Sequence, residues 1–255
     1  MKLATWNVNS LKVRLPHVVE WMGSASPDVL VMQEIKQVTE AFPADAFAEL
    51  GYHSIASGQK TYNGVAVAAR SPVTDSVTDM PGFEDPQRRV LAVTVGDLRV
   101  VNLYVPNGSS VGSEKYEYKL AWLSALHDYL QDELKTHKNL VVLGDFNIAP
   151  DDRDVYDPVK WGDDILCSPA ERAALRKLIE LGLTDVYRQF EQPQAAFSWW
   201  DYRAAGFRRN AGLRIDLILA SKAMSGACLA SYIDREPRTW DRPSDHAPVL
   251  AEFSV

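Results

Sequence analysis

Short runs of apolar residues recur along the chain, and they limit its fold more than any other feature of the sequence. Three of them, GVAVAA, RVLAVTV and RVVNLYV, follow one another between residues 64 and 105 and predict consecutive strands joined by turns. Such a series is typical of an antiparallel or mixed sheet. Further runs that predict strands lie at 3–6, 29–32, 140–143, 214–221 and 247–255.

Helical patterns separate several of these runs. Residues 114–135 repeat apolar side chains every three or four positions, which predicts a helix. A second helix is expected where Ser168 can cap the N-terminus, Pro169 takes the first helical position and Glu171 completes a capping box. Another helix is expected to begin near Pro16, since proline is favoured in a first turn. Together these patterns predict an α/β fold.

Length and composition favour one soluble-type domain. No Pro/Gly/Ser-rich linker or charge block divides the 255 residues, so we expect a single domain over residues 1–255. No apolar run approaches the ~18 residues that a membrane span needs, and the N-terminal MKLATWNVNS is not typical of a secretory signal. Cys167 and Cys228 lack CxxC spacing, which indicates a reducing compartment and no zinc site. We therefore expect a cytoplasmic protein without a membrane partner.

The net charge of −7 argues against a general nucleic-acid binder. The placement of the basic residues points the other way. Between residues 202 and 215 the chain carries four arginines and no acid: Arg203, Arg208, Arg209 and Arg214. This run is either a solvated loop or a surface that contacts phosphates, and the sequence leaves both interpretations open.

Polar residues stand where the predicted strands end. In LVVLGDFNIAP, residues 140–150, Gly144 breaks an apolar run and Asp145 and Asn147 follow directly. Asp and Asn after a strand commonly bond their own backbone in a turn. Other predicted strands, however, also carry polar residues at or near their ends: Asn7, Gln33, Glu34, Tyr104, Asn107, Asp216, Asp245 and His246. Because sites in α/β proteins gather where strand ends meet loops, this set favours a shared site over separate turns.

The residue types in this set indicate metal-assisted phosphate chemistry. Oxygen ligands with one histidine and no cysteine suit Mg²⁺ or Mn²⁺ better than zinc. Glu34 and Asp245 would be the metal carboxylates, and Asp145 would orient or deprotonate an attacking water. No phosphate-binding GxxxxGK[ST] loop, HExxH, GxSxG or strand-linked GxGxxG sequence is present.

The remaining members of the set would stabilise the charge that develops on the phosphate. His246, Asn147 and Tyr104 offer hydrogen-bond donors for it. Asp216 lies among apolar neighbours, so it needs a partner, and either His246 or Arg214 would serve. Paired with His246, Asp216 would orient the imidazole and hold it charged.

Seven segments carry a family resemblance, in order across nearly the whole chain: TWNVNSLK, VLVMQEIK, NLYVPNG, VVLGDFNIAP, FSWWDYR, GLRIDLILAS and PSDHAPV. Together they resemble the exonuclease III family of abasic-site endonucleases, within the endonuclease/exonuclease/phosphatase superfamily. The resemblance implies a four-layer α/β sandwich, deoxyribonuclease I-like, in which two mixed β-sheets pack face to face with helices outside.

The resemblance also implies an activity. It is the Mg²⁺-dependent hydrolysis of the phosphodiester 5′ to an abasic site in double-stranded DNA, which leaves a 3′-hydroxyl. The family also has, to varying degrees, 3′→5′ exonuclease and 3′-end-cleaning activities. The expected partner is double-stranded DNA with abasic sites or 3′ ends, and we expect the protein to act as a monomer. Asn9 stands where some members carry Asp, so the number of metal ions stays open.

The motifs assign residues by resemblance. Glu34 would be the main metal ligand, with Asn7 and Asp245 close by. The residues implied in handling water and phosphate are Asp145, Asn147, His246, Asp216 and Tyr104. The expected DNA contacts rest on the residues themselves: Asn107 at a strand end, and the basic run Arg203, Arg208, Arg209 and Arg214. A small apolar pocket for the bare sugar of an abasic site would be formed by Trp199, Leu213 and Ile215.

Two other functions use the same sequence features. One is a phosphodiesterase or phosphatase that acts on RNA, a lipid headgroup or inositol phosphate, with the same metal and histidine set. The other is a DNA-binding or scaffold protein with an inactive site. The arginine run and the Trp pair at 199–200 favour DNA over the first, and the complete set of acids, amides and histidine counts against the second.

Overall fold

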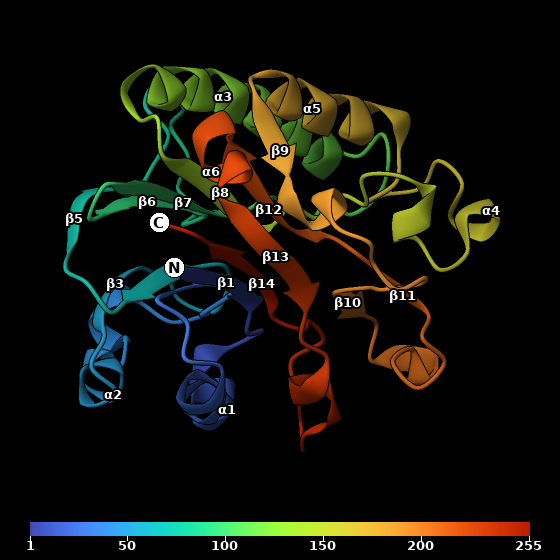
Figure 1. The fold of residues 1–255 in the computed structure, drawn as a ribbon. Coiled ribbons are helices and arrows are strands. Elements are labelled where there is room, and N and C mark those ends of the chain that lie inside the picture. Colours follow the sequence, from blue (N-terminus) through green and yellow to red (C-terminus); the bar gives the residue numbers. More distant parts are fainter.

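The computed structural model describes all 255 residues, and its first β-sheet is built from the two ends of the chain. The strand order is β13-β14-β1-β2-β4-β3 (Figure 1). The strands are β1 Lys2–Asn7, β2 Val29–Gln33, β3 His53–Ser57, β4 Val65–Ala69, β13 Cys228–Ile233 and β14 Val249–Phe253. β1 and β2 pair in parallel and all other neighbours are antiparallel, so this sheet is mixed.

The second sheet has the order β5-β6-β7-β8-β12-β9. Its strands are β5 Val73–Val77, β6 Val90–Val95, β7 Leu98–Tyr104, β8 Leu140–Asp145, β9 Leu183–Asp185 and β12 Asp216–Ser221. Only β7 and β8 pair in parallel, so this sheet is mixed as well. A separate two-stranded ribbon joins β10 (Trp199–Trp200) to β11 (Gly212–Leu213).

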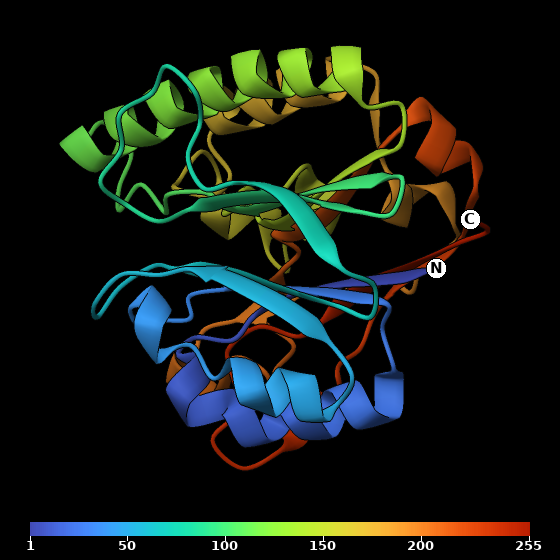
Figure 2. The ribbon, with the colours of Figure 1, turned by 90° about the vertical axis from the view of Figure 1, so that its left-hand side faces the viewer.

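Helices cover the outer faces of the two sheets, which gives four layers (Figure 2). The longer helices are α1 Leu11–Ala25, α3 Glu114–Thr136 and α5 Pro169–Glu180, and the shorter ones are α2 Ala44–Glu49, α4 Pro158–Trp161 and α6 Lys222–Gly226. Single 3₁₀ turns occupy η1 Thr39–Ala41, η2 Asp152–Asp154, η3 Val186–Gln189, η4 Arg203–Ala205 and η5 Glu236–Thr239. The predicted α/β sandwich of two mixed sheets with helices outside is confirmed. No helix is both long and apolar enough to cross a membrane.

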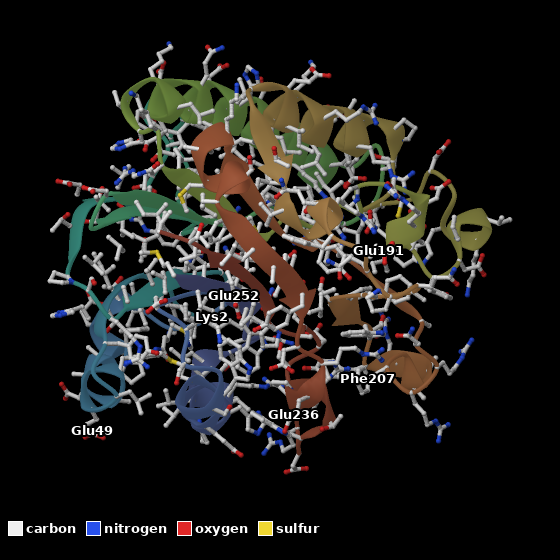
Figure 3. All side chains as sticks on the ribbon, viewed as in Figure 1. Lys2, Glu49, Glu191, Phe207, Glu236 and Glu252 are labelled. Atoms are coloured by element: carbon white, nitrogen blue, oxygen red, sulfur yellow. The ribbon has the colours of Figure 1, made fainter.

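Three buried apolar clusters hold these layers together, and side chains fill the space between the ribbons (Figure 3). Val31 and Leu143 belong to the cluster between the sheets. Trp122 and Leu126 pack α3 onto the second sheet, and Trp21 packs α1 onto the first. Full burial of such side chains stabilises each layer by roughly 1.5–3 kcal/mol per residue. The two sheets are therefore held in a fixed relation to one another.

Buried polar residues also link the two sheets. Gln33, the last residue of β2, donates from Nε2 to Asn102 Oδ1 on β7 at 2.8 Å. Asn102 Nδ2 in turn donates to the main-chain oxygens of Met32 and Ala66 at 3.0 and 2.9 Å. Because a buried amide must keep its partners, these bonds fix how the ends of β2 and β7 lie relative to each other.

Two details of the predicted elements are wrong. α1 begins at Leu11, so Pro16 lies inside the helix and not in its first turn. The ring removes one backbone bond, and packing of the helix against the first sheet offsets that loss. GVAVAA and RVLAVTV do not form neighbouring strands. They form β4 and β6, which belong to different sheets, and β5 comes between them in the sequence. The sequence of β5, VTDSV, is mostly exposed and lacks an apolar run.

Gly144 is required by the close pairing of β7 and β8. It has φ 154° and lies opposite Leu103 in the parallel register. A Cβ atom at this position would lie 1.9 Å from the Leu103 carbonyl oxygen. The glycine therefore lets β8 approach β7 at the point where the polar residues begin.

We predict that Gly144→Ala lowers the free energy of unfolding by at least about 2 kcal/mol, because the added methyl must push two paired strands apart. The matched control is Gly23→Ala in α1, where nothing lies within 4 Å of the added carbon. That substitution should raise stability by up to about 1 kcal/mol. Urea unfolding of both variants measures the difference, and equal effects at the two positions would contradict the close approach.

Candidate active site

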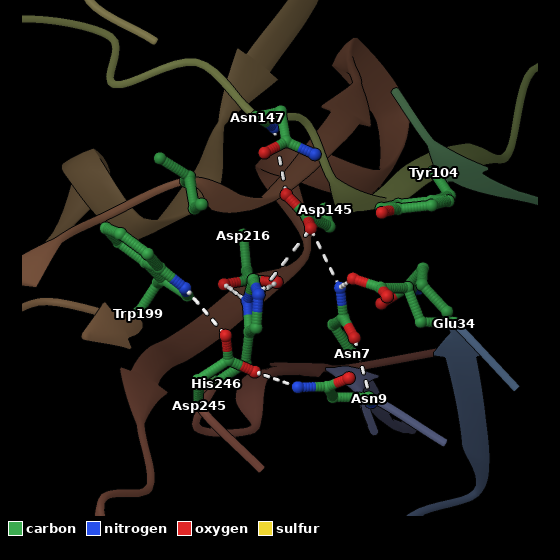
Figure 4. Close-up of polar contacts among 12 residues, drawn as sticks. Asn7, Asn9, Glu34, Tyr104, Asp145, Asn147, Trp199, Asp216, Asp245 and His246 are labelled. Atoms are coloured by element: carbon green, nitrogen blue, oxygen red, sulfur yellow. Dashed lines mark hydrogen bonds and ion pairs between the residues drawn. The ribbon is translucent and has the colours of Figure 1, made fainter. Parts of the chain in front are cut away.

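Three polar residues of the second sheet lie side by side at one edge. Tyr104 ends β7, Asp145 ends β8 and Asp216 begins β12. Tyr104 is paired with Asp145 in the parallel register, and Asp145 is paired with Asp216 in the antiparallel register. The register of three neighbouring strands thus places a phenol and two carboxylates in one row (Figure 4).

The first sheet contributes residues from the facing edge. Asn7 ends β1, Glu34 follows β2, and His246 lies just before β14. Asn7 Nδ2 donates to Glu34 Oε1 and to Asp145 Oδ2, at 2.9 Å each (Figure 4). Glu34 has φ 52°, a backbone conformation that costs energy in a residue other than glycine and that clusters at functional sites. A single amide therefore joins carboxylates that come from different sheets.

The Asp145–Asn147 segment is both a turn and part of this site. Asp145 Oδ1 accepts from the main-chain N–H of Asn147 at 2.9 Å, which is the turn geometry expected of Asp after a strand. Asn147 has φ 49° and uses its Nδ2 to donate to Val105 O at 3.0 Å. Its Oδ1 accepts from Asn107 Nδ2 at 3.2 Å. The turn interpretation and the site interpretation of the sequence are therefore compatible.

His246 is the partner of Asp216. The Nδ1 atom of the imidazole lies 2.9 Å from Asp216 Oδ2, and both side chains are buried. Nε2 lies 3.7 Å from Asp145 Oδ2. Burial favours the neutral ring, but the Asp216 and Asp145 carboxylates outweigh it and raise the pKa of His246 to about 10. The imidazole is therefore cationic at neutral pH.

Burial also changes the protonation of the neighbouring acids and phenol. Burial raises the pKa of Asp145 to about 7; the His246 cation opposes this shift and Asp216 adds to it. Burial and the nearby Glu34 and Asp145 carboxylates raise the pKa of Tyr104 well above its ordinary value, so the phenol stays a hydrogen-bond donor. Arg89 lies over the Tyr104 ring, 4.7 Å from its centroid.

The acidic groups fit a divalent cation. One ligand atom each from Glu34, Asp145 and His246 lies within 4.8 Å of the others. Burial alone would raise the pKa of Glu34, but Lys36 and the Asn7 amide outweigh it and lower that pKa, so the carboxylate is charged. Lys36 Nζ lies 2.8 Å from Glu34 Oε2, which puts a cation beside this carboxylate. Because a cationic His246 has no lone pair for a metal, the ligands in this group are the carboxylate oxygens of Glu34 and Asp145, which suit Mg²⁺ or Mn²⁺.

Asp245 lies at the rim of this cluster. Its Oδ1 accepts from Asn9 Nδ2 at 2.9 Å and its Oδ2 from Trp199 Nε1 at 3.0 Å. Both oxygens thus have protein partners, and Asp245 is not among the three residues whose ligand atoms group together. Lys36 and Asn9 are site residues that the sequence analysis did not assign; their place beside Glu34 and Asn7 in the motifs is the signal that would have found them.

The arginines of the 202–215 segment have different surroundings. Arg208 and Arg209 are exposed and form no ion pair, whereas exposed Arg203 pairs with Asp201. Arg214 is buried and pairs with Asp154 and Asp185 at 2.6 and 2.7 Å. The interpretations of Arg214 as a phosphate contact or as the partner of Asp216 are therefore wrong, because its guanidinium lies inside the protein between two acids.

The predicted apolar trio comes together, but only one member is partly exposed. Leu213 and Ile215 are buried in a small cluster that includes Cys167, and Trp199 packs against that cluster. Trp199 also pairs with Leu213 across the β10–β11 ribbon. Among the predicted DNA contacts, Asn107 is exposed beside Asn147.

We predict that Asp216→Asn lowers the pKa of His246, because the substitution removes the larger of the two attractive charges. The raised pKa means that the pair stabilises the fold fully below about pH 6.5, the ordinary histidine value, and less as pH rises through about 10. The variant should lose this part of the pH dependence. Nitrogen NMR of the imidazole in metal-free protein at pH 8 measures it: a protonated ring in wild type and a neutral ring in the variant are expected, and identical rings would contradict the pairing.

Known proteins are similar to this chain in sequence and in fold. An exodeoxyribonuclease III from Haemophilus influenzae is 37% identical, with 99% of this chain and 100% of that protein covered. A structure described as a 3′ phosphatase from Neisseria bound to a product DNA hairpin is 50% identical with a TM-score of 0.98, over 100% of both chains. An AP endonuclease structure from Archaeoglobus fulgidus is 38% identical with a TM-score of 0.95, again over 100% of both chains. Residues 4–246 match the family described as endonuclease/exonuclease/phosphatase, and the chain belongs to that family.

Proposed function

We propose that the chain is a metal-dependent DNA-repair nuclease that hydrolyses phosphodiesters at 3′ ends and 5′ to abasic sites in double-stranded DNA. The observation that carries the proposal is the grouping of Glu34, Asp145 and His246, whose ligand atoms lie within 4.8 Å of one another where strands of both sheets end. A relative described as an exodeoxyribonuclease III, a 3′ phosphatase structure with bound DNA and an AP endonuclease structure support DNA as the substrate.

In this proposal Glu34 is the main metal ligand, and Asn7 and Asp245 support it. Mg²⁺ is the proposed ion, with Mn²⁺ as a substitute, because the ligands are carboxylate and amide oxygens. The bound ion would neutralise charge on the scissile phosphate and orient it for in-line attack. Asn7 donates to Glu34 through Nδ2, so it fixes the direction in which the carboxylate points.

Asp145 orients the attacking water and accepts its proton. Hydrogen bonds from Asn7 and from the main chain of Asn147 hold the two carboxylate oxygens. A pKa of about 7 is suited to a general base near neutral pH, because the group is then partly ionised and still basic. The Asp145 carboxylate therefore combines a fixed position with useful basicity.

Donors from both sheets stabilise the charge on the phosphate. His246, held cationic by Asp216, binds a phosphate oxygen through Nε2. Tyr104 donates from its phenol. One N–H of the Asn147 amide bonds Val105 O, and the second is available to a phosphate oxygen. Loss of one such donor costs roughly 10²–10³ in rate where a charge develops in a water-excluded site.

We predict that Glu34→Gln shifts the rate against Mg²⁺ concentration so that half-maximal activity needs at least about 10-fold more metal, with the fold retained. The physical reason is the loss of the charged ligand. Glu133→Gln is the control, because that carboxylate pairs with Arg99 on the second sheet and not with the site. A wild-type metal dependence in Glu34→Gln would remove Glu34 from the metal site.

DNA would contact the exposed arginines of the 202–215 segment. It would also contact Asn107, whose side chain bonds that of Asn147. Arg208 and Arg209 are exposed and form no ion pair, and in the sequence they directly follow Phe207, which Figure 3 labels. Arg203 is also exposed, and its contact with Asp201 must loosen for it to bind a phosphate.

We predict that replacing Arg208 and Arg209 with Gln flattens the slope of log affinity against log salt by roughly 0.9 for each phosphate that the variant no longer neutralises. Arg176→Gln is the matched control, because Arg176 is exposed on α5 in the outer helical layer. Filter binding of duplex DNA between low and moderate salt measures the slopes. Equal slopes in all three proteins would mean that the segment is only a solvated loop.

We propose that the rim beside Asp245 distinguishes an abasic site from an intact nucleotide. Trp199, with Leu213 and Ile215 behind it, would form an apolar contact for a sugar without a base. A flipped abasic sugar gives up little stacking, so a small apolar pocket favours it over an intact nucleotide. We also propose that residues 1–255 act as one catalytic domain and as a monomer, because one chain supplies every residue of the site.

The test is a set of matched substrates under Mg²⁺, with Asp145→Asn as the inactive control. The set contains duplexes with a recessed 3′ end, a 3′-phosphate at a nick, an abasic site and no lesion, together with RNA and inositol phosphate. The proposal expects hydrolysis of the first three duplexes, little of the intact one, and none after chelation. Hydrolysis of RNA or inositol phosphate in place of DNA would support the alternative phosphodiesterase, and no hydrolysis at all would support the inactive scaffold.

A further inference from the structure

Lys119 is a buried lysine with no assigned role. It lies in the second turn of α3 and is fully buried. Its Nζ donates to Asn107 O at 3.1 Å, to Asn147 O at 2.7 Å and to the Glu171 carboxylate. An ammonium group has three N–H donors, so every donor of Lys119 has a partner inside the protein.

The two carbonyl groups belong to the loops that leave β7 and β8 at the site. Asn107 and Asn147 also contact each other through their side chains, at 3.2 Å. The main-chain N–H of Asn147 in turn fixes Asp145. Lys119 therefore bonds the backbone of the same two residues whose amides are proposed to meet the substrate.

Glu171 holds Lys119 in place from a third element. Its carboxylate accepts from Leu166 N at 3.1 Å, Ser168 N at 3.1 Å and Ser168 Oγ at 2.6 Å, at the N-terminus of α5. Both members of the pair have fully buried side chains. A buried ion pair gives no more stability than well-packed apolar residues of similar size, because desolvation offsets the attraction. Stability alone therefore does not account for this pair.

We propose that Lys119 is a positioning residue, which holds the Asn107 and Asn147 loops in register with Asp145 while Glu171 fixes its ammonium group. The proposal rests on the proposed function for its effect on activity, and on geometry for its effect on the loops. Its consequence is that loss of Lys119 acts through Asn147 and costs activity out of proportion to stability. Misplacing a reacting group by about 1 Å can cost roughly 10²-fold in rate.

The test variant is Lys119→Met with Glu171→Gln, because Gln keeps a capping oxygen for Ser168 and leaves no unpaired buried charge. The proposal expects kcat on a recessed duplex to fall about 10–100-fold, with KM within about threefold. In an Asn147→Ala background, which keeps the main chain of residue 147 but removes its amide, the same two changes should lower kcat by a smaller factor, because the amide that Lys119 positions is already gone. An equal loss in both backgrounds, or an unchanged kcat, would overturn the proposal.

Arg99→Met with Glu133→Gln is the matched control. This pair also joins the second sheet to α3, with Arg99 Nε 2.6 Å from Glu133 Oε2, but it lies at the opposite end of β7 from the site. Whatever its effect on stability, this control should keep kcat in both backgrounds. If the Lys119 double variant does not fold, Lys119→Arg replaces it. Because the planar guanidinium cannot reproduce three tetrahedral bonds, a reduced kcat is again expected and an unchanged kcat overturns the proposal.

Hydrogen exchange separates this proposal from the proposed function. The main-chain N–H of Asn147 should exchange at least about 10-fold faster in the Lys119 variant than in wild type, and at the wild-type rate in the Arg99 control. Unchanged exchange would overturn the positioning role even if kcat fell. If the wild-type protein hydrolyses no DNA, the proposed function fails, while exchange at Asn147 still decides whether Lys119 holds the loop.

Discussion

The side-chain amide of Asn7 is the contact on which the site depends. It donates to Glu34 in the first sheet and to Asp145 in the second, at 2.9 Å each. Each sheet alone carries only part of the polar set. The apolar cluster between the sheets and the Gln33–Asn102 bond keep their strand ends at a constant separation. The Asn7 amide then joins the strand ends of the two sheets into one cluster of charged groups.

Electrostatics explains why these groups are buried together. Two carboxylates, Asp145 and Asp216, face each other across paired strands, which would be costly without a cation. His246 lies against both and supplies the compensating charge. Glu34 has Lys36 as a neighbour for the same reason. Burial still outweighs the attraction of the His246 cation at Asp145, with Asp216 adding to it, and so raises the pKa of the carboxyl group that is proposed to accept a proton.

Local sequence patterns predicted the strands and helices that neighbouring residues determine. β8 and β12 followed from continuous apolar runs, and the α5 capping box followed from Ser168 and Glu171. β5 was missed because its residues are mostly exposed and carry no apolar signal. The polar residues that the structure brings together could be selected from the sequence because they stand at or near the ends of recognisable strands.

The sequence did not predict the surroundings of residues whose partners are distant in the chain. Arg214 stands in a basic run, but its acids, Asp154 and Asp185, lie 60 and 29 residues away, and nothing local indicates that they bury it. Lys119 is similar. A lone lysine in an amphipathic helix predicts a solvated face, whereas the loops after β7 and β8 and the start of α5 enclose it completely.

The central claim is that strand ends of both sheets form one metal site around Glu34. The most direct measurement is anomalous diffraction from crystals of the wild-type protein soaked in Mn²⁺, with Glu34→Gln crystals treated in the same way. The account predicts a Mn²⁺ peak within coordination distance of the Glu34 carboxylate, on the side that faces Asp145 and His246, and a weaker or absent peak in the variant. Peaks only at other positions, or an equal peak in Glu34→Gln, would contradict it.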